Sequence, residues 1–169
     1  METTTAHIVQ INVSPGGVPK RPISRGTVTR ERILGDDWND KRHHGLPGQA
    51  LCLFSLETIE ELVREGYPVF PGALGENLTT SGLDYRTVRP GQQYAIGAEV
   101  RIRITKVRQP CRTIAVYGPS LLRALFDAEV KRGSTDSPRW GRSGFYAEVL
   151  REGTIAPGDP LYPVGTPPV

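Results

Sequence analysis

Residues 99–112 read EVRIRITKVRQPCR, and this stretch decides the fold class of the chain. Its first half alternates strictly, because arginines separate the apolar residues Val100, Ile102 and Ile104. Successive side chains of a β-strand point to opposite faces, so the alternation predicts a strand with one face in the core and one in solvent. The alternation slips at 106–107, as a β-bulge would cause, and bulges re-aim side chains beside functional sites.

The second half of this stretch places Cys111 between Arg108 and Arg112. A thiol acts as a nucleophile or a metal ligand only as the thiolate, and neighbouring positive charge favours the thiolate. The two arginines can supply that charge if they fold back toward the sulfur. The alternative is a small buried apolar side chain at the end of a strand, which is what most free cysteines are. The local sequence leaves both interpretations open.

The other predicted elements are short. Strand patterns cover 6–13, 27–30, 50–54, 94–97, 145–150 and 161–164, and helical patterns cover 56–65 and 121–131. Many short strands with two helices favour a mainly β, α+β fold, namely a β-barrel or curled mixed sheet with about two short helices, over a doubly wound α/β fold. An exposed edge of such a sheet can pair with a second copy, so a homodimer is compatible with this fold.

Length and composition suggest one domain in a reducing compartment. The chain has 169 residues, so we expect a single domain over 1–169, with its core at 8–164 and a flexible tail at 165–169. The absence of a long apolar run and of a basic, apolar leader argues against a membrane span and a secretory signal. Two cysteines make no disulfide framework, and a cytoplasmic location is expected.

The charge distribution argues against nucleic acid as a partner. The net charge is +3, but lysines and arginines are spread along the chain, without a basic run or a basic–aromatic alternation. A mild positive excess favours an anionic small molecule as readily as a polynucleotide. We therefore expect a small-molecule substrate, and neither a nucleic acid nor a membrane as partner.

Two basic residues and two adjacent histidines are further candidates for a binding site. Pro19 and Pro22 hold Lys20 and Arg21 in an extended conformation on a stiff loop or edge, for which a solvated basic loop is the simpler interpretation. His44 follows another histidine and precedes Gly45-Leu46-Pro47-Gly48. Adjacent side chains on a strand point in opposite directions, so the two imidazoles do not easily share a metal ion. We expect one of them to face a pocket.

A glycine-rich stretch, residues 70–83, reads FPGALGENLTTSGL. Its glycines indicate irregular backbone, and Asn77 and Thr79 supply hydrogen-bonding groups beside exposed amides. Such a loop can hold a phosphate or a polar heterocycle through backbone N–H groups. It lacks the Gly-Lys-Ser/Thr of a nucleotide-binding P-loop. A plain turn leading into a strand remains the alternative.

Two more predictions concern side chains near a ligand. Cys52 stands in the apolar run Ala50 to Phe54, and we expect it to belong to the core. The polar, turn-rich segment 133–144 is expected to be a mobile loop. Its Arg139, Trp140 and Arg142 can close over a ligand.

Taken together, these stretches resemble a known family. The combination is Asp40-x-x-x-His44-Gly45, then Pro71-Gly72-x-x-Gly75-Glu76-Asn77-Leu78, then Pro110-Cys111, then Gly158-Asp159. It resembles the MOSC domain, which is found at the C-terminus of molybdenum cofactor sulfurases and as separate bacterial proteins. The resemblance runs from about 8 to 164 and implies a β-barrel-like fold with few helices.

The resemblance also implies a cofactor and residue roles. The family cysteine corresponds to Cys111, whose thiolate would ligate molybdenum or carry sulfur. The chain would bind the molybdenum cofactor, a molybdopterin, and reduce N-hydroxylated compounds with electrons from a separate donor protein. The cofactor-binding positions would be Lys20, Arg21, His44, Gly75, Asn77 and Thr79, with Arg108 and Arg112 beside the thiolate.

Three hypotheses therefore stand beside one another. The first is a molybdenum-dependent reductase in which Cys111 is the metal ligand. The second is a sulfur carrier or sulfurtransferase, in which Cys111 holds a persulfide received from a sulfur donor. The third is a ligand-binding module in which Cys111 is chemically inert.

Overall fold

The computed structural model describes residues 5–38 and 46–165. Its strands are β1 (His7–Val13), β2 (Arg21–Ile23), β3 (Gly26–Val28), β4 (Leu51–Ser55), β5 (Leu78–Ser81), β6 (Gln93–Ile96), β7 (Val100–Val107), β8 (Phe145–Arg151), β9 (Gly153–Ile155) and β10 (Leu161–Pro163). Its α-helices are α1 (Leu56–Arg64), α2 (Leu121–Leu125) and α3 (Ala128–Lys131), and its 3₁₀ helices are η1 (Tyr85–Thr87) and η2 (Arg112–Tyr117). Each strand pattern predicted from the sequence overlaps an observed strand.

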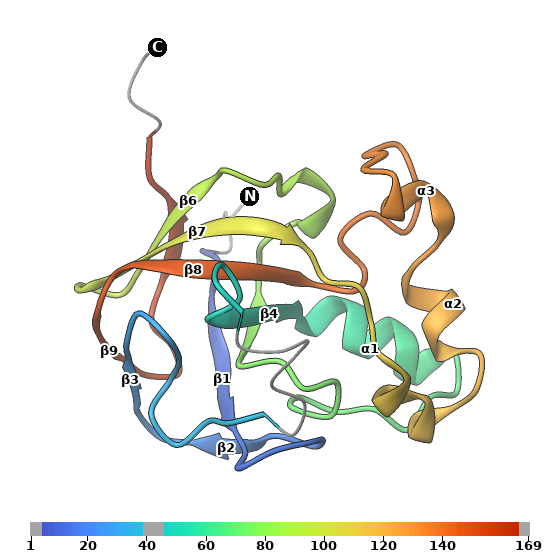
Figure 1. Cartoon of the computed structure of the whole chain (residues 1–169), viewed down its shortest axis with the longest axis horizontal. Coiled ribbons are helices and arrows are strands. Elements are labelled where there is room, and N and C mark those ends of the chain that lie inside the picture. The colour runs from blue at the N-terminus through green and yellow to red at the C-terminus, as the bar shows by residue number, and fades with distance from the viewer. Residues whose placement is uncertain (1–4, 39–45, 166–169) are drawn as a thin grey trace.

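One mixed sheet organises the fold (Figure 1). Eight strands of the described residues pair in the order β10-β6-β7-β8-β4-β5-β1-β2, and β3 and β9 form a separate ribbon. The β4–β5 pair is parallel. An isolated bridge between His7 and Pro160, and a hydrogen bond of 3.0 Å from the Ile8 amide to the Asp159 carbonyl, bring β1 beside the β10 edge.

The predicted β-barrel is therefore corrected to a curled open sheet. Among the described residues, β1 and the segment before β10 share an isolated bridge and a few backbone hydrogen bonds, but no continuous ladder. A barrel closes when hydrogen bonds run without a break around the ring. The mainly β, α+β class itself is confirmed.

Within the stretch 99–112, residues Val100–Val107 form β7, as the alternation predicts. Val100, Ile102 and Ile104 are buried, and Arg101 is exposed. The pairing of β7 with β8 shifts register between Ile104 and Lys106, just before the residues 106–107 at which the sequence predicts a bulge. β7 leads directly into the segment that carries Cys111.

The helices lie together on one side of the sheet, and the β3–β9 ribbon lies at the opposite end (Figure 1). A helix is observed where the 56–65 pattern predicts one, but the pattern at 121–131 forms two helices. Phe126 is extended, with φ −150° and ψ 140°. Asp127 then starts α3 by accepting a hydrogen bond of 2.8 Å from the Val130 amide. Aspartate is a preferred N-cap residue, and here it begins a new helix where periodicity alone predicts continuation.

The segment 133–144 is anchored, which corrects the prediction of a mobile loop. The Trp140 indole N–H donates to the Val88 carbonyl at 2.9 Å, and the ring is buried. The Arg142 guanidinium donates to the Ala124 carbonyl at 3.0 Å and to Glu61 at 2.8 Å. These contacts hold the segment on the core and on α1, so it does not serve as a lid.

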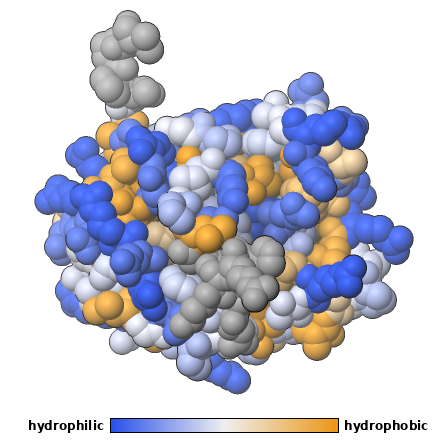
Figure 2. Space-filling view, viewed as in Figure 1, coloured by the Kyte–Doolittle hydropathy of each residue, from blue (hydrophilic) through white to orange (hydrophobic). Residues whose placement is uncertain are grey.

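The visible face in Figure 2 is mostly hydrophilic, with apolar side chains in separate patches. No helix within 5–38 or 46–165 combines the length and apolar character needed to cross a bilayer. Of the predicted tail at 165–169, residues 166–169 lie outside the described residues.

Candidate functional site

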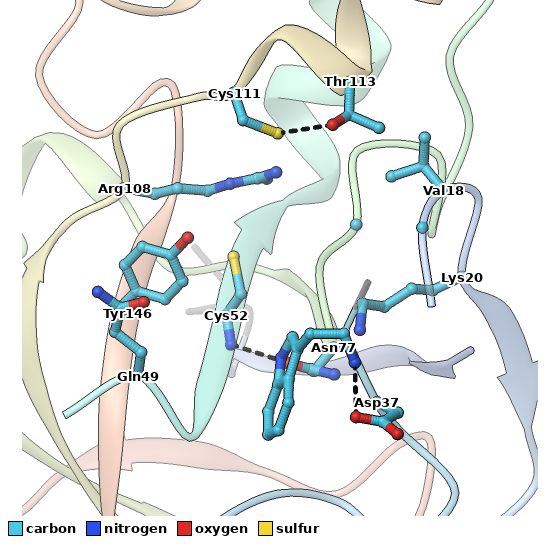
Figure 3. Close-up of a pocket in the computed structure, with 13 residues that line it drawn as sticks. Val18, Lys20, Asp37, Gln49, Cys52, Asn77, Arg108, Cys111, Thr113 and Tyr146 are labelled. Atoms are coloured by element: carbon cyan, nitrogen blue, oxygen red, sulfur yellow. Dashed lines mark hydrogen bonds between the residues drawn. The ribbon is translucent and has the colours of Figure 1, made fainter. Parts of the chain in front are cut away.

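A cavity of about 120 Å³ lies where several loops meet the ends of β4, β7 and β8 (Figure 3). The β1–β2 loop, the glycine-rich loop before β5 and the segment after β7 supply most of its wall. Its lining residues are Gly17, Val18, Lys20, Asp37, Trp38, Gln49, Cys52, Gly75, Asn77, Arg108, Cys111, Thr113 and Tyr146. The cavity brings together both cysteines and two buried cations.

Cys111 reaches this cavity because the chain turns sharply after β7. Pro110 cannot continue a strand ladder, and η2 begins at the residue after Cys111. The thiol is partly exposed and donates a hydrogen bond to the Thr113 hydroxyl at 3.2 Å. The sulfur is thus accessible from the cavity.

Arg108 supplies the positive charge that the sequence predicts beside the sulfur. The side chain is only 5% exposed, and it extends between Cys111 and Cys52 (Figure 3). Burial lowers the pKa of Arg108, but the neighbouring Cys52 and Tyr146 outweigh it, so the pKa stands above the ordinary value and the group remains charged. Arg112, in contrast, is exposed and lies outside the cavity lining.

Cys52 differs from Cys111 in its surroundings. It lies within β4 and is buried, as the sequence predicts, but its side chain also lines the cavity. Burial raises the pKa of the Cys52 thiol, and the charge of Arg108 only partly opposes this. Cys52 therefore keeps its proton at neutral pH. Cys111 is the better candidate for a thiolate.

Asn77 ties the cavity floor to the sheet. Its side-chain oxygen accepts from the Cys52 amide at 3.0 Å, and its side-chain nitrogen donates to the Asp36 carboxylate at 2.9 Å. Asp36 is buried and also accepts from the Lys20 ammonium at 2.5 Å. Lys20 is 8% exposed, so the simpler interpretation of a solvated basic loop is wrong for this residue. Arg21 is exposed and lies outside the lining.

A buried carboxyl group shapes the glycine-rich loop. Glu76 accepts hydrogen bonds from the Gly72 amide at 3.0 Å and from the Thr79 hydroxyl at 3.3 Å. Burial raises the pKa of Glu76 to about 7, although these hydrogen bonds and the charge of Arg108 oppose the rise. Thr79 is fully buried and lies behind the cavity wall.

Gly75 brings this loop close to Arg108. Its φ is +82°, and an added Cβ would lie 3.2 Å from Val18 Cγ1 and 3.6 Å from Arg108 Nη2. A side chain here would be strained by the backbone and would fill the space between the loop and the guanidinium. Glycine therefore keeps part of the cavity open.

The structure thus brings together five of the predicted site residues, whereas Arg21, Thr79 and Arg112 lie outside the cavity lining. Cys111, Arg108, Lys20, Gly75 and Asn77 line one cavity. His44 lies outside the described residues.

Sequence reasoning missed Asp36 and Tyr146. Asp36 pairs with Lys20 across separate loops. Tyr146 stands opposite Cys52 in the β4–β8 register, and burial raises the pKa of its phenol to about 12. No local pattern marks either residue, because both positions depend on pairing between distant segments.

The chain is similar to known proteins over most of its length. Residues 40–162 match the family model described as the MOSC domain. The uncharacterized protein YflK of Bacillus subtilis is 32% identical over 147 residues, which is 84% of this chain and 60% of the relative. A protein of Gibberella moniliformis named "Reductase" is 31% identical over 133 residues, which is 76% of this chain and 22% of the relative. The chain thus spans less than two thirds of either relative.

Solved structures match the fold. The crystal structure of YiiM from Geobacillus stearothermophilus superposes with a TM-score of 0.71 at 29% identity, covering 95% of this chain and 75% of that one.

Proposed function

The chain belongs to the MOSC domain family, and on that premise we propose that it binds the molybdenum cofactor through Cys111 and reduces N-hydroxylated small molecules. The observation that carries this proposal is the convergence of an accessible thiol, a permanently charged guanidinium and a buried ammonium on one cavity. The name of the Gibberella relative, a reductase, supports redox chemistry.

The residues of the cavity fit this cofactor. Molybdenum takes a soft thiolate among its donors, and Cys111 is the accessible thiol. A phosphate-bearing pterin needs cations, which Lys20 and Arg108 provide, and Gly75 leaves space beside the Arg108 guanidinium. The cavity of about 120 Å³ is smaller than small-molecule sites of roughly 300–1,000 Å³. It would therefore hold one end of the cofactor.

The reaction has a simple balance. The N–O bond of the substrate breaks, two electrons and two protons are taken up, the nitrogen gains a hydrogen and the oxygen leaves as water. When bound, the cofactor supplies the two-electron oxygen-atom chemistry, and a separate electron-donor protein supplies the electrons. Arg108 keeps its charge beside the reacting centre and favours the Cys111 thiolate. The Tyr146 phenol, with a pKa near 12, keeps its proton and can donate a hydrogen bond at neutral pH.

The first test is metal analysis. Wild type, Cys111→Ser and Arg112→Ala would be purified from a host that makes the cofactor, and molybdenum per chain would be measured by mass spectrometry. We expect near-stoichiometric metal in the wild type and in Arg112→Ala, whose side chain is exposed, and at least a tenfold loss in Cys111→Ser. Reduction of benzamidoxime with a chemically reduced viologen should follow the metal content. Equal molybdenum in Cys111→Ser, or none in the wild type, would contradict the proposal.

The sulfur-carrier alternative depends on the same thiol. A cation beside an accessible cysteine also suits a persulfide anion. Intact-mass measurement of metal-free protein would then show one added sulfur on Cys111, lost on reduction and absent from Cys111→Ser. An inert binding module would instead bind its ligand equally well as Cys111→Ala.

A further inference from the structure

A second, larger cavity adjoins the first. It has a volume of about 670 Å³, and Gln49, Cys111 and Tyr146 line both cavities. We call it the outer groove, lined by Leu46, Gln49, Pro90, Lys106, Val107, Gln109, Pro110, Cys111, Phe126, Val130, Lys131, Gly133, Trp140 and Tyr146. The accessible sulfur of Cys111 therefore stands where the two spaces meet.

The outer groove has an apolar, partly aromatic wall. Phe126, Val130 and Trp140 come from the α2–α3 region and the anchored segment after it. The indole N–H of Trp140 is occupied by the Val88 carbonyl, so Trp140 offers the groove an apolar surface. Apolar and aromatic walls of this kind suit a flat hydrophobic ligand.

The break between α2 and α3 contributes to this wall. Phe126 is extended and partly buried. In a continuous helix over 121–131, helical periodicity would set the direction of the Phe126 side chain. Because the helix breaks there, the extended backbone of Phe126 sets this direction instead. The break between α2 and α3 therefore lies at a residue that lines the groove.

Two lysines are the charged residues among the described residues that line the outer groove. Lys106 extends from β7, with its ammonium 5.7 Å from the centre of the Tyr146 ring, and Lys131 is exposed at the end of α3. None of the described residues that line the groove is acidic. Where Lys131 lines the groove, an anionic group is therefore attracted and a cationic one is repelled.

We propose that the outer groove binds the substrate, a small molecule with a flat apolar body and one anionic group. Its volume lies within the range of small-molecule sites, roughly 300–1,000 Å³. A ligand lying along the aromatic wall, with its anion toward Lys131, has its other end beside Cys111. The placement of the N-hydroxyl group at this end depends on the proposed function. The shape and charge of the ligand are inferred from the groove alone.

Two dyes of the same skeleton test the groove without any catalysis. 1-Anilinonaphthalene-8-sulfonate is anionic and N-phenyl-1-naphthylamine is neutral, and each fluoresces more strongly on an apolar surface. We expect the full-length wild type to bind the anionic dye more tightly than the neutral one. Lys131→Glu should weaken binding of the anionic dye about fivefold, because electrostatic attraction becomes repulsion. The affinity for the neutral dye should stay unchanged.

The control is the next residue. Arg132 is exposed, pairs with Glu129 and does not line the groove, so Arg132→Glu makes the same charge change outside it. This variant should bind both dyes as the wild type does. Phe126→Leu, which keeps an apolar side chain, should weaken both dyes. If Lys131→Glu and Arg132→Glu weaken the anionic dye equally, or if neither does, the inference is overturned.

Kinetics then separate this inference from the proposed function. With cofactor-loaded protein, 4-carboxybenzamidoxime should show a lower KM than benzamidoxime, and Lys131→Glu should remove this preference with little change in kcat. Reduction of both compounds without any preference would overturn the groove assignment and leave the reductase intact. Dye binding that depends on Lys131 in a protein without molybdenum would support the groove while the reductase proposal fails.

Discussion

At the scale of single residues, burial and exposure give side chains of the same chemical type different properties. Cys111 and Cys52 line one cavity, but Cys52 lies in a central strand and its pKa is raised, whereas Cys111 lies on an accessible turn. Arg108 and Arg112 flank the same cysteine, yet only Arg108 enters the cavity. The direction in which the backbone leaves β7 therefore decides that Arg108 and Cys111 line the cavity and Arg112 does not.

Glu76 gives a prediction about pH and stability. Burial raises its pKa from 4.5 to about 7, so between these values the folded protein holds a proton that the unfolded chain releases. The stability contributed is complete below pH 4.5 and is lost as the pH rises toward 7. The loss is at most about 3 kcal/mol of unfolding free energy. Urea unfolding at about pH 5 and about pH 7.5 measures it.

The matched variant is Glu76→Gln. The glutamine oxygen can still accept from the Gly72 amide, and the side chain carries no charge at either pH. We expect the difference in stability between the two pH values to shrink clearly in this variant. An unchanged difference would show that another group causes it.

At the scale of elements, capping residues decide where helices begin. Ser55 ends β4 and accepts a hydrogen bond of 3.3 Å from the Thr58 amide at the start of α1. Ser120 precedes α2 in the same way, but its side chain makes no capping hydrogen bond. Two serines in equivalent positions thus have different roles.

This difference can be measured. Ser55→Ala should lower the free energy of unfolding by about 1 kcal/mol, the usual value of an N-cap. Ser120→Ala should lower the free energy of unfolding by only a few tenths of about 1 kcal/mol, because this substitution removes only an exposed hydrogen bond to Tyr67. Chemical denaturation of both variants provides the comparison. Equal losses would argue against the capping role of Ser55.

At the scale of the whole molecule, the core has two apolar clusters that share a residue. One cluster lies within the sheet, the other packs beneath α1 and α2, and Phe126 contacts both. The first and last described strands are also tied together, since the Leu161 amide donates to the Ala6 carbonyl at 2.8 Å. These connections favour cooperative unfolding of the predicted single domain.

We therefore expect one unfolding transition. Trp140 is buried in the sheet cluster, whereas Trp38 lines the cavity, so the two tryptophans sample different regions. Urea curves from far-UV circular dichroism and from the fluorescence of Trp38→Phe and Trp140→Phe should each fit one transition, with m-values matching the wild type. Two separate transitions in one variant would contradict a single cooperative unit.

The sequence alone determined the local features of this protein. The alternation at 99–105 predicts β7, the apolar stripe at 56–65 predicts α1, and the motifs around Asn77 and Cys111 indicate the family, because periodicity, turn chemistry and short motifs are written in neighbouring residues. Only the tertiary structure decided which side chains share a cavity. The pairing of Lys20 with Asp36, the burial of Glu76 and the open form of the sheet arise from contacts between segments far apart in the chain, which no local pattern encodes.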